Sequence, residues 1–222
     1  MVKTTNEMIQ GNSGKISVRA RGLKEYADKN VLVMVQGANI SGQLGFDLSF
    51  PGGGNYSFMD AMVSNKIAAV TFSIRGYGQS ELNENPLNVQ TDQAIEDLVS
   101  VIKWLNHKKI TKIHLLGWSW GGRIVARYAQ NNSEKIYTLI LLDPAMGGGQ
   151  LILPAPKNEW WDNTYEYFYN RLESEFTELS AREALAKLAS KEESKSPNGI
   201  RQENAKGSIP VNLNEIKNST LM

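Results

Sequence analysis

Four strongly apolar runs, separated by segments of different character, constrain the fold of this chain most. Continuous apolar strands are typical of parallel sheets that are buried on both faces. Strands that alternate with helices are typical of doubly wound α/β folds. We therefore predict a mostly parallel, doubly wound α/β sheet that is covered on both faces. The apolar runs are 30–37, 66–74, 112–118 and 135–143, and the helix-like segments between or after them are 56–65, 91–105 and 120–131.

Two stretches of the amino-terminal half complete this assignment. "KISVRAR" at 15–21 alternates apolar and polar residues, which predicts a half-buried strand. Residues 38–55, "ANISGQLGFDLSFPGGGN", have the composition of a loop.

The character of the chain changes after the last apolar run. Residues 158–176 are rich in aromatic side chains, and 180–195 has the pattern of a charged, amphipathic helix. The stretch 196–208 is polar and resembles a linker, whereas 211–222 ends on residues that can begin another strand. We therefore predict a helical excursion from the sheet over 146–208.

Composition narrows the classes of partner. The chain has 24 Lys and Arg against 23 Asp and Glu, which gives no electrostatic case for nucleic acid or an anionic membrane. It has no Cys, so disulfides and thiolate metal sites are excluded, and no cofactor or metal motif is evident. No apolar run approaches the roughly 20 residues that span a bilayer, and the first residues lack the apolar core of a signal peptide. We expect a cytoplasmic protein.

Ser119 is the strongest candidate for a catalytic group. It lies in "GWSWG", 117–121, which fits the pattern G-x-S-x-G. The pattern by itself is weak, but a predicted strand precedes it and a predicted helix begins at Trp120. A tight strand-to-helix turn requires small residues two positions before and two positions after the Ser, and it raises the hydroxyl above the carboxyl end of the sheet. This context predicts a nucleophile elbow.

Several segments of 15–145 together resemble the α/β-hydrolase fold family. The resemblance is carried by "VLVMVQGAN", by "SIRGYGQS" at 73–80, by "HLLGWSWGG" and by "LILLDPA", which occur in the order and at the spacing of that family. It implies a core over 1–145, a helical cap over 146–208 and an incomplete return to the core over 209–222. The carboxyl-terminal strands of the family would be missing.

The resemblance also implies roles for individual residues. Ser119 would attack an acyl carbon, and the backbone N–H groups of Trp120 and Ala38 would stabilise the oxyanion. The chain departs from the family pattern at two positions: Gln36 stands where His is usual, and Ser73 stands where Asp is usual. The change at Gln36 alters polar packing under the oxyanion loop and leaves the Ala38 N–H available, while the change at Ser73 implies only a local effect.

A base for Ser119 is not evident. In this family the base is a His downstream of the elbow, and the chain has only His107 and His114, both upstream. His114 precedes Ser119 by five residues on one strand, roughly 16 Å at about 3.3 Å per residue, so we expect it to pack on the strand. His107 is expected on the surface, at the opposite end of the strand from Ser119.

The carboxylate that would orient the base has one candidate, Asp143, which has two interpretations. Asp143 ends the apolar run beside the elbow strand, where some family members carry the triad acid, but it also fits a turn residue before Pro144. The resemblance implies that the usual acid, the His and the final helix lie beyond Met222. The strand at 135–143 would then be an exposed apolar sheet edge, open to self-association.

The aromatic residues bear on the substrate. Trp120 can line an apolar pocket or pack under the elbow, and the aromatic stripe of 158–176 can be core or can face Ser119. If it faces Ser119, the substrate is apolar. We therefore expect a serine hydrolase of the carboxylester type that acts on a small apolar ester-like substrate, with activity of this chain in doubt for lack of a His. The alternatives are a non-catalytic ligand- or partner-binding protein of the same fold, or a truncated product without function.

Overall fold

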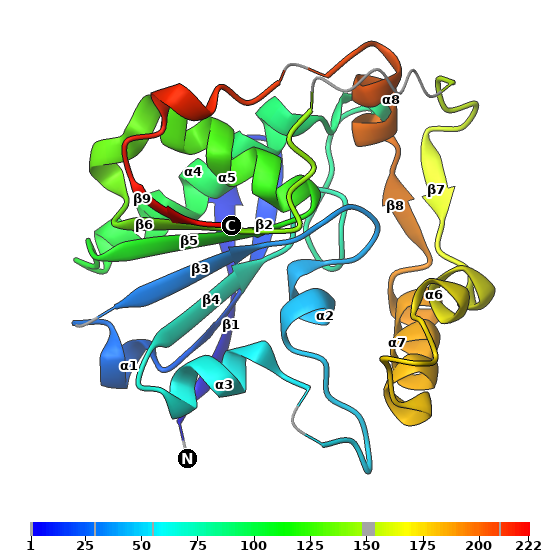
Figure 1. Cartoon of the computed structure of the whole chain (residues 1–222), viewed down its shortest axis with the longest axis horizontal. Helices are drawn as coiled ribbons and strands as arrows, with labels where there is room; N and C mark the ends of the chain where they lie inside the picture. Colours follow the sequence, from blue (N-terminus) through cyan, green and yellow to red (C-terminus); the bar gives the residue numbers. More distant parts are fainter. Residues whose placement is uncertain (1, 29, 55, 148–153, 209) are drawn as a thin grey trace.

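The computed structural model describes residues 2–28, 30–54, 56–147, 154–208 and 210–222. These residues form one seven-stranded sheet with the strand order β1-β2-β4-β3-β5-β6-β9 and a separate two-stranded sheet of β7 and β8 (Figure 1). The large sheet consists of β1 (Thr4–Gly11), β2 (Gly14–Arg21), β3 (Val31–Val35), β4 (Ala68–Phe72), β5 (Ile113–Trp118), β6 (Thr138–Leu142) and β9 (Ser219–Leu221).

The four predicted apolar runs are confirmed as the parallel centre of the sheet. β4, β3, β5 and β6 are adjacent and parallel, and every residue of β3 and β4 is buried. The predicted strand at 15–21 is β2, which pairs antiparallel with β4. The sequence analysis missed β1, which forms a hairpin with β2 from Thr4 opposite Arg21 to Gly11 opposite Gly14. β1 is polar and largely exposed because it is an edge strand, so it carries no apolar pattern.

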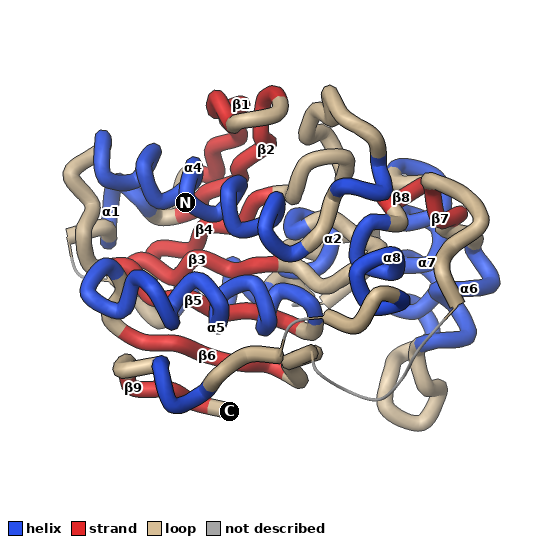
Figure 2. Tube along the Cα trace, turned by 90° about the horizontal axis from the view of Figure 1, so that it is seen from above, coloured by secondary structure: helices blue, strands red, loops and turns tan. Residues whose placement is uncertain are grey.

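Helices cover both faces of the sheet (Figure 1), and Figure 2 shows the two long helices of one face in front of the strands. The predicted helices over 56–65, 91–105 and 120–131 are confirmed as α3, α4 and α5. The stretch 38–55, predicted as loop throughout, contains the short α2. Ser41 caps the start of this helix, because its side chain accepts a hydrogen bond from the Leu44 N–H at 3.1 Å. The helices are α1 (Leu23–Tyr26), α2 (Gly42–Phe46), α3 (Phe58–Ser64), α4 (Thr91–His107), α5 (Trp120–Asn132), α6 (Tyr165–Arg171), α7 (Leu179–Glu192) and α8 (Gly199–Ala205), with 3₁₀ turns at Pro86–Asn88, Ser133–Lys135 and Leu213–Glu215.

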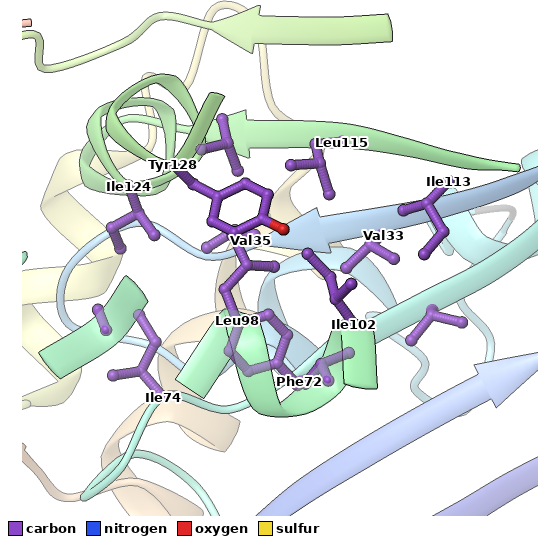
Figure 3. Close-up of a cluster of buried hydrophobic side chains, with 14 of the residues drawn as sticks. Val33, Val35, Phe72, Ile74, Leu98, Ile102, Ile113, Leu115, Ile124 and Tyr128 are labelled. Atoms are coloured by element: carbon purple, nitrogen blue, oxygen red, sulfur yellow. The ribbon is translucent and has the colours of Figure 1, made fainter. Parts of the chain in front are cut away.

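The larger core lies between the sheet and α4 and α5. Figure 3 shows Leu98 of α4 and Ile124 of α5 packed against Val33, Phe72 and Leu115 of the central strands. All five side chains are buried completely. Burial of side chains of this size contributes about 1.5–3 kcal/mol each. The layer therefore holds the strand ends in fixed positions.

A smaller core lies on the opposite face. Leu32 and Met34 alternate with the residues of the larger core along β3, so they point to the other side of the sheet. There they pack with Phe46 of α2 and Met59 of α3. Both faces of the central strands are therefore buried, as the continuous apolar runs predict.

The segment from Trp160 to Ala205, here called the lateral segment, lies beside the carboxyl ends of the parallel strands (Figure 1). It consists of β7 (Trp160–Asp162), α6, α7, β8 (Lys195–Pro197) and α8. The helix predicted over 180–195 is α7. Residues 148–153, near the start of the predicted helical excursion, lie outside the described residues.

The prediction that 196–208 is a linker is wrong. This stretch contains α8, and a Cβ added at Gly199 would lie 2.1 Å from the Val89 carbonyl oxygen, so the helix packs directly on the chain before α4. Ile200 is buried, and the Glu203 carboxylate accepts hydrogen bonds from the N–H and the hydroxyl of Thr91 at 2.8 and 2.6 Å. The polar composition of this stretch suggested a linker, but its polar side chains bond to residues of the main sheet layer such as Thr91 of α4.

The prediction that 135–143 is an exposed sheet edge is also wrong for most of β6. β9 pairs in parallel with β6, with Ser219 opposite Thr138 and Leu221 opposite Ile140. The outer edge in the described residues is therefore the three-residue β9, where Leu221 is 66% exposed. Association of copies through this edge stays a prediction. None of the described helices has the length and apolar character needed to cross a membrane.

Candidate active site

Ser119 occupies the turn between β5 and α5. Its backbone has φ 53° and ψ −115°, a conformation that side-chain-bearing residues rarely adopt. Strain of this kind costs about 1–3 kcal/mol, and it persists only where the surrounding structure holds it in place. Here the Ser119 N–H donates to the Leu142 carbonyl at 3.0 Å, and its own carbonyl accepts from the Gly122 and Ala145 N–H groups.

The glycines of the motif are required by close backbone contacts. A Cβ at Gly117 would lie 2.2 Å from the Gly121 carbonyl oxygen, and a Cβ at Gly121 would lie 2.1 Å from the Val35 carbonyl oxygen. Both distances are far below van der Waals contact. The start of α5 therefore packs directly on the end of β3. This contact explains why small residues are needed two positions before and two positions after Ser119.

The loop after β3 passes beside the Ser119 side chain. A Cβ added at Gly37 would lie 3.3 Å from the Ser119 Cβ, so the Ala38 amide follows at the next position. Within the described part of the chain, neither the Ala38 N–H nor the Trp120 N–H donates a hydrogen bond. An oxyanion site requires backbone N–H groups that are not already engaged in hydrogen bonds. The role of these two amides in stabilising an oxyanion is a proposal.

Asp143 lies next to the same turn. Leu142 pairs with Trp118 across β6 and β5, so Asp143 follows β6 at the level where Ser119 follows β5. Asp143 is exposed and has φ 42°, a second left-handed residue at this edge. Arg123 donates to the Ala145 carbonyl at 2.7 Å and so fixes the loop after Asp143. The position is compatible with a carboxylate that would orient a base, and this role is also a proposal.

Both histidines lie away from Ser119. His114 pairs with Leu32 near the amino-terminal ends of the parallel strands β5 and β3. Its ring nitrogens contact Thr138 Oγ1 at 2.7 Å and Asn30 Oδ1 at 2.9 Å. Burial lowers the pKa of His114. His107 is exposed at the end of α4. The chain therefore brings no imidazole to the nucleophile.

The two aromatic neighbours of Ser119 pack in different directions. Trp120 is 1% exposed, and its indole N–H donates to Thr91 Oγ1 at 3.1 Å. Its ring lies 6.2 Å from the ring of Tyr77. Of the two interpretations of Trp120, the structure favours packing under the elbow. Trp118 is half-buried and packs against the clusters on the opposite face of the sheet.

Gln36, which departs from the family pattern, supports the loop after β3. Its side-chain oxygen accepts hydrogen bonds from the Gly42 N–H at 2.7 Å and the Ile74 N–H at 3.2 Å. It therefore ties the loop on the oxyanion side to the end of β4. At the other departure, Ser73, the carbonyl accepts from the Ser80 hydroxyl at 2.6 Å.

The sequence analysis missed Asn39, which joins the loop after β3 to the lateral segment. Asn39 has φ 86° and is 5% exposed. Its amide donates to Tyr167 at 2.6 Å, its side-chain oxygen accepts from Arg201 at 2.8 Å, and its carbonyl accepts from Asn163 at 2.7 Å. The aromatic stripe therefore does reach this loop through Tyr167. The contacts span more than a hundred residues, so no local pattern could reveal them.

A second link to the lateral segment uses Glu193. Its carboxylate accepts hydrogen bonds from the N–H and the hydroxyl of Ser41, the first at 2.6 Å. Burial raises the pKa of Glu193, although the bonds from Ser41 act in the opposite direction. A carboxyl that is harder to ionise in the folded chain than in the unfolded chain reduces stability as pH rises above its unfolded pKa of about 4.3.

We therefore expect Glu193→Gln to remove one contribution to the pH dependence of the free energy of unfolding. The wild-type free energy of unfolding should include a loss that develops above pH about 4.3, and the glutamine variant should lack this loss because it carries no charge and can still bond to Ser41. Urea unfolding at several pH values between pH about 4 and about 8 measures the difference. Glu183→Gln, at an exposed position of α7 whose charge does not contribute to the shift of Glu193, is the control and should follow the wild-type curve. Parallel curves for wild type and Glu193→Gln would contradict the expectation.

A family model described as "alpha/beta hydrolase fold" matches residues 48–212. The chain belongs to the α/β hydrolase fold family. The match includes the elbow at Ser119 and the whole lateral segment. A comparison with curated proteins finds no match.

Solved structures share the fold at low sequence identity. A thioesterase domain from the curacin biosynthetic pathway has a TM-score of 0.67 at 16% identity, covering 98% of this chain and 82% of that domain. A bacterial membrane phospholipase A has a TM-score of 0.66 at 17% identity, covering 98% and 68%. A predicted CIB-like hydrolase from Thermoplasma acidophilum has a TM-score of 0.51 at 14% identity. The alignment covers 65% of this chain and 64% of the length of that hydrolase.

Proposed function

We propose that this α/β hydrolase fold chain carries the nucleophile and the oxyanion site of a serine hydrolase that acts on an ester or a related acyl substrate. One observation carries the proposal: Ser119 is held at φ 53° between Gly117 and Gly121, beside the loop that begins at Gly37. A strained non-glycine residue at a strand-to-helix turn serves packing poorly, but it presents a hydroxyl group well.

The proposed chemistry assigns each group one task. The Ser119 Oγ attacks the acyl carbon, and its proton passes to a base while a tetrahedral oxyanion forms. The N–H groups of Trp120 and Ala38 donate to that oxyanion, which is typically worth about 2.7–4 kcal/mol for each donor. The oxyanion then collapses, the alcohol or related leaving group takes up the proton, and water releases the acyl group in a second cycle. Asp143 would orient the base.

The base must come from outside these residues, because neither histidine of the chain reaches Ser119. A Ser hydroxyl without a base is a weak nucleophile. The lateral segment would act as the cap over the site, since Asn39 and Ser41 both bond to it. The remote positions of both histidines favour the second candidate, a binding protein of the same fold that performs no chemistry.

The test separates the nucleophile from the missing base. A fluorophosphonate probe is expected to label wild-type protein at Ser119 slowly, and Ser119→Ala is expected to abolish labelling. Added imidazole is expected to raise the rate of p-nitrophenyl acetate hydrolysis more with wild-type protein than with Ser119→Ala, because imidazole can act as the absent base. Peptide mass mapping locates the label, and absorbance at the nitrophenolate band gives the rate.

Ser133→Ala is the matched control, since Ser133 lies at the far end of α5, where its hydroxyl donates to the Ala129 carbonyl. This variant should label and respond to imidazole as the wild type does. Equal hydrolysis by wild type and Ser119→Ala at every imidazole concentration, together with absent labelling, would reject the hydrolase proposal and leave the binding protein. Rapid turnover without imidazole would show that a base is present after all.

A further inference from the structure

Arg201 of α8 is a half-buried cation whose contacts are all neutral. It donates to Asn39 Oδ1 at 2.8 Å and to Asn198 Oδ1 at 3.1 Å, and its guanidinium lies 3.9 Å from the centre of the Trp161 ring. Among the described residues no carboxylate lies within ion-pair distance of it. A guanidinium has five N–H groups, so these two bonds and a contact with the neutral Tyr167 hydroxyl do not use all of them.

Two more deeply buried arginines have carboxylate partners. Arg75 contacts Asp97 at 2.7 Å, and Arg123 lies 3.6 Å from Glu203. A buried cation is costly unless an anion or equivalent hydrogen bonds compensate it. Burial lowers the pKa of Arg201, which expresses that cost. Arg201 therefore keeps a charge that the described part of the chain leaves without a counter-charge.

The guanidinium is held in a fixed position. α8 packs on the chain before α4 through Gly199, and Glu203 bonds to Thr91. The Trp161 ring, which supports the guanidinium, is itself fixed edge-on to Tyr167 at 5.3 Å. A charged group held between an aromatic face and two amide oxygens loses little further freedom when it binds a ligand.

Arg201 also lines a cavity of about 610 Å³ between the lateral segment and residues 154–158. Two aromatic side chains, Trp160 and Trp161, form part of its wall, and its exposed charged residues are Lys157 and Asp162, which offset one another. The cavity has the size of a small-molecule site. Its net charge comes from Arg201.

The cavity is connected to the oxyanion loop through one side chain. Arg201 bonds to Asn39, and Asn39 directly follows Ala38. Standard bond lengths place the guanidinium within roughly 11 Å of the Ala38 N–H. That distance is within the length of a small acyl molecule, although Ala38 and Ser119 are not part of the cavity wall.

We propose that Arg201 and the Trp160–Trp161 wall form a subsite for a carboxylate, and that the acyl substrate of this protein carries such an anionic group at its distal end. The acyl part of the inference rests on the proposed function of Ser119. The carboxylate part stands by itself, because binding requires no reaction. Arg suits this task because its planar fork meets both oxygens of a carboxylate.

Calorimetric titration with phenylacetate and with its neutral counterpart phenylacetamide tests the subsite. The wild type is expected to bind phenylacetate at least about tenfold more tightly, since hydrogen bonds to charged groups are worth that factor or more. Arg201→Gln should bind both probes within about twofold of each other. Arg201→Lys should keep part of the preference, because it keeps the charge without the fork.

Arg182→Gln is the matched control. Arg182 lies over the Tyr169 ring at 3.9 Å and donates to the Tyr169 carbonyl, but it is not part of the cavity wall. This variant and Ser119→Ala should both keep the full preference for phenylacetate. Equal binding of the two probes by the wild type would overturn the proposal, as would an unchanged preference in Arg201→Gln.

The two proposals fail separately. Labelling of Ser119 without a carboxylate preference would leave the hydrolase and reject the subsite. A carboxylate preference without labelling would keep the subsite and reject the hydrolase. If thermal unfolding shows that Arg201→Gln is not folded, the wild-type preference and the reduced preference of Arg201→Lys decide the outcome.

Discussion

The Gly121→Ala variant is expected to lose about 3 kcal/mol or more of stability and all labelling at Ser119. The added Cβ would lie 2.1 Å from the Val35 carbonyl oxygen and 2.5 Å from that of Gln36. Overpacking usually costs about 1–3 kcal/mol, and the upper end applies here because both obstacles are backbone atoms at the end of a central strand, which cannot rotate away. The start of α5 would have to move off β3, which would release Ser119 from its strained turn.

Urea unfolding and fluorophosphonate labelling measure the two effects of Gly121→Ala. Gly54→Ala is the control, since a Cβ there meets no described atom within 4 Å and Gly54 lacks a left-handed φ. It should stay within about 0.5 kcal/mol of the wild type and label normally. Wild-type stability in Gly121→Ala would show that the contact with β3 is looser than described. Retained labelling would show that the turn is not needed for the nucleophile.

Asp97→Ala is expected to destabilise the protein by about 3 kcal/mol or more. Asp97 is completely buried in α4 and accepts hydrogen bonds from the Arg75 N–H at 2.9 Å, Nε at 3.0 Å and Nη2 at 2.7 Å. Burial works against the charge of Arg75, but its bonds to Asp97 raise its pKa overall. Removal of the carboxylate would leave a buried cation with only its contacts to Glu84 and Glu96.

The effect of Asp97→Ala should reach the candidate site. The Arg75 turn carries Tyr77, whose ring packs against Trp120 at the start of α5. We therefore expect slower labelling of Ser119 as well as lower stability, measured by the same two assays. Asp92→Ala is the control, because the Asp92 side chain is 68% exposed and its pair with Arg127 is worth at most about 1 kcal/mol. Equal losses in both variants would contradict the buried-pair explanation.

The sequence predicts the elements in which local pattern and tertiary environment agree. β3 and β4 are apolar at every position because both of their faces are buried, so the periodicity alone identifies them. The same holds for the elbow at Ser119, where Gly117 and Gly121 are required by contacts within a few ångströms. Family resemblance then orders these elements correctly in the core.

Polar elements with distant partners escape the same reasoning. β1 is an exposed edge strand. The polar composition of α8 resembles that of a linker, and the partners that hold the helix in place, such as Thr91, are far away in sequence. The prediction that 211–222 ends on residues that can begin a strand is confirmed by β9, but three residues carry no pattern that reveals the pairing with β6. In each case the stabilising contact is long-range, and local propensity contains no record of it.

The sequence by itself determined the parallel α/β core, the position of Ser119 on its turn and the lack of a histidine downstream of it, because these depend on local periodicity, glycine spacing and composition. Only the tertiary structure decided that His114 bonds to Thr138 and Asn30, and that Asn39 of the loop after β3 meets Arg201. That contact joins residues 162 positions apart, so it exists only once the lateral segment has packed against the carboxyl edge of the sheet.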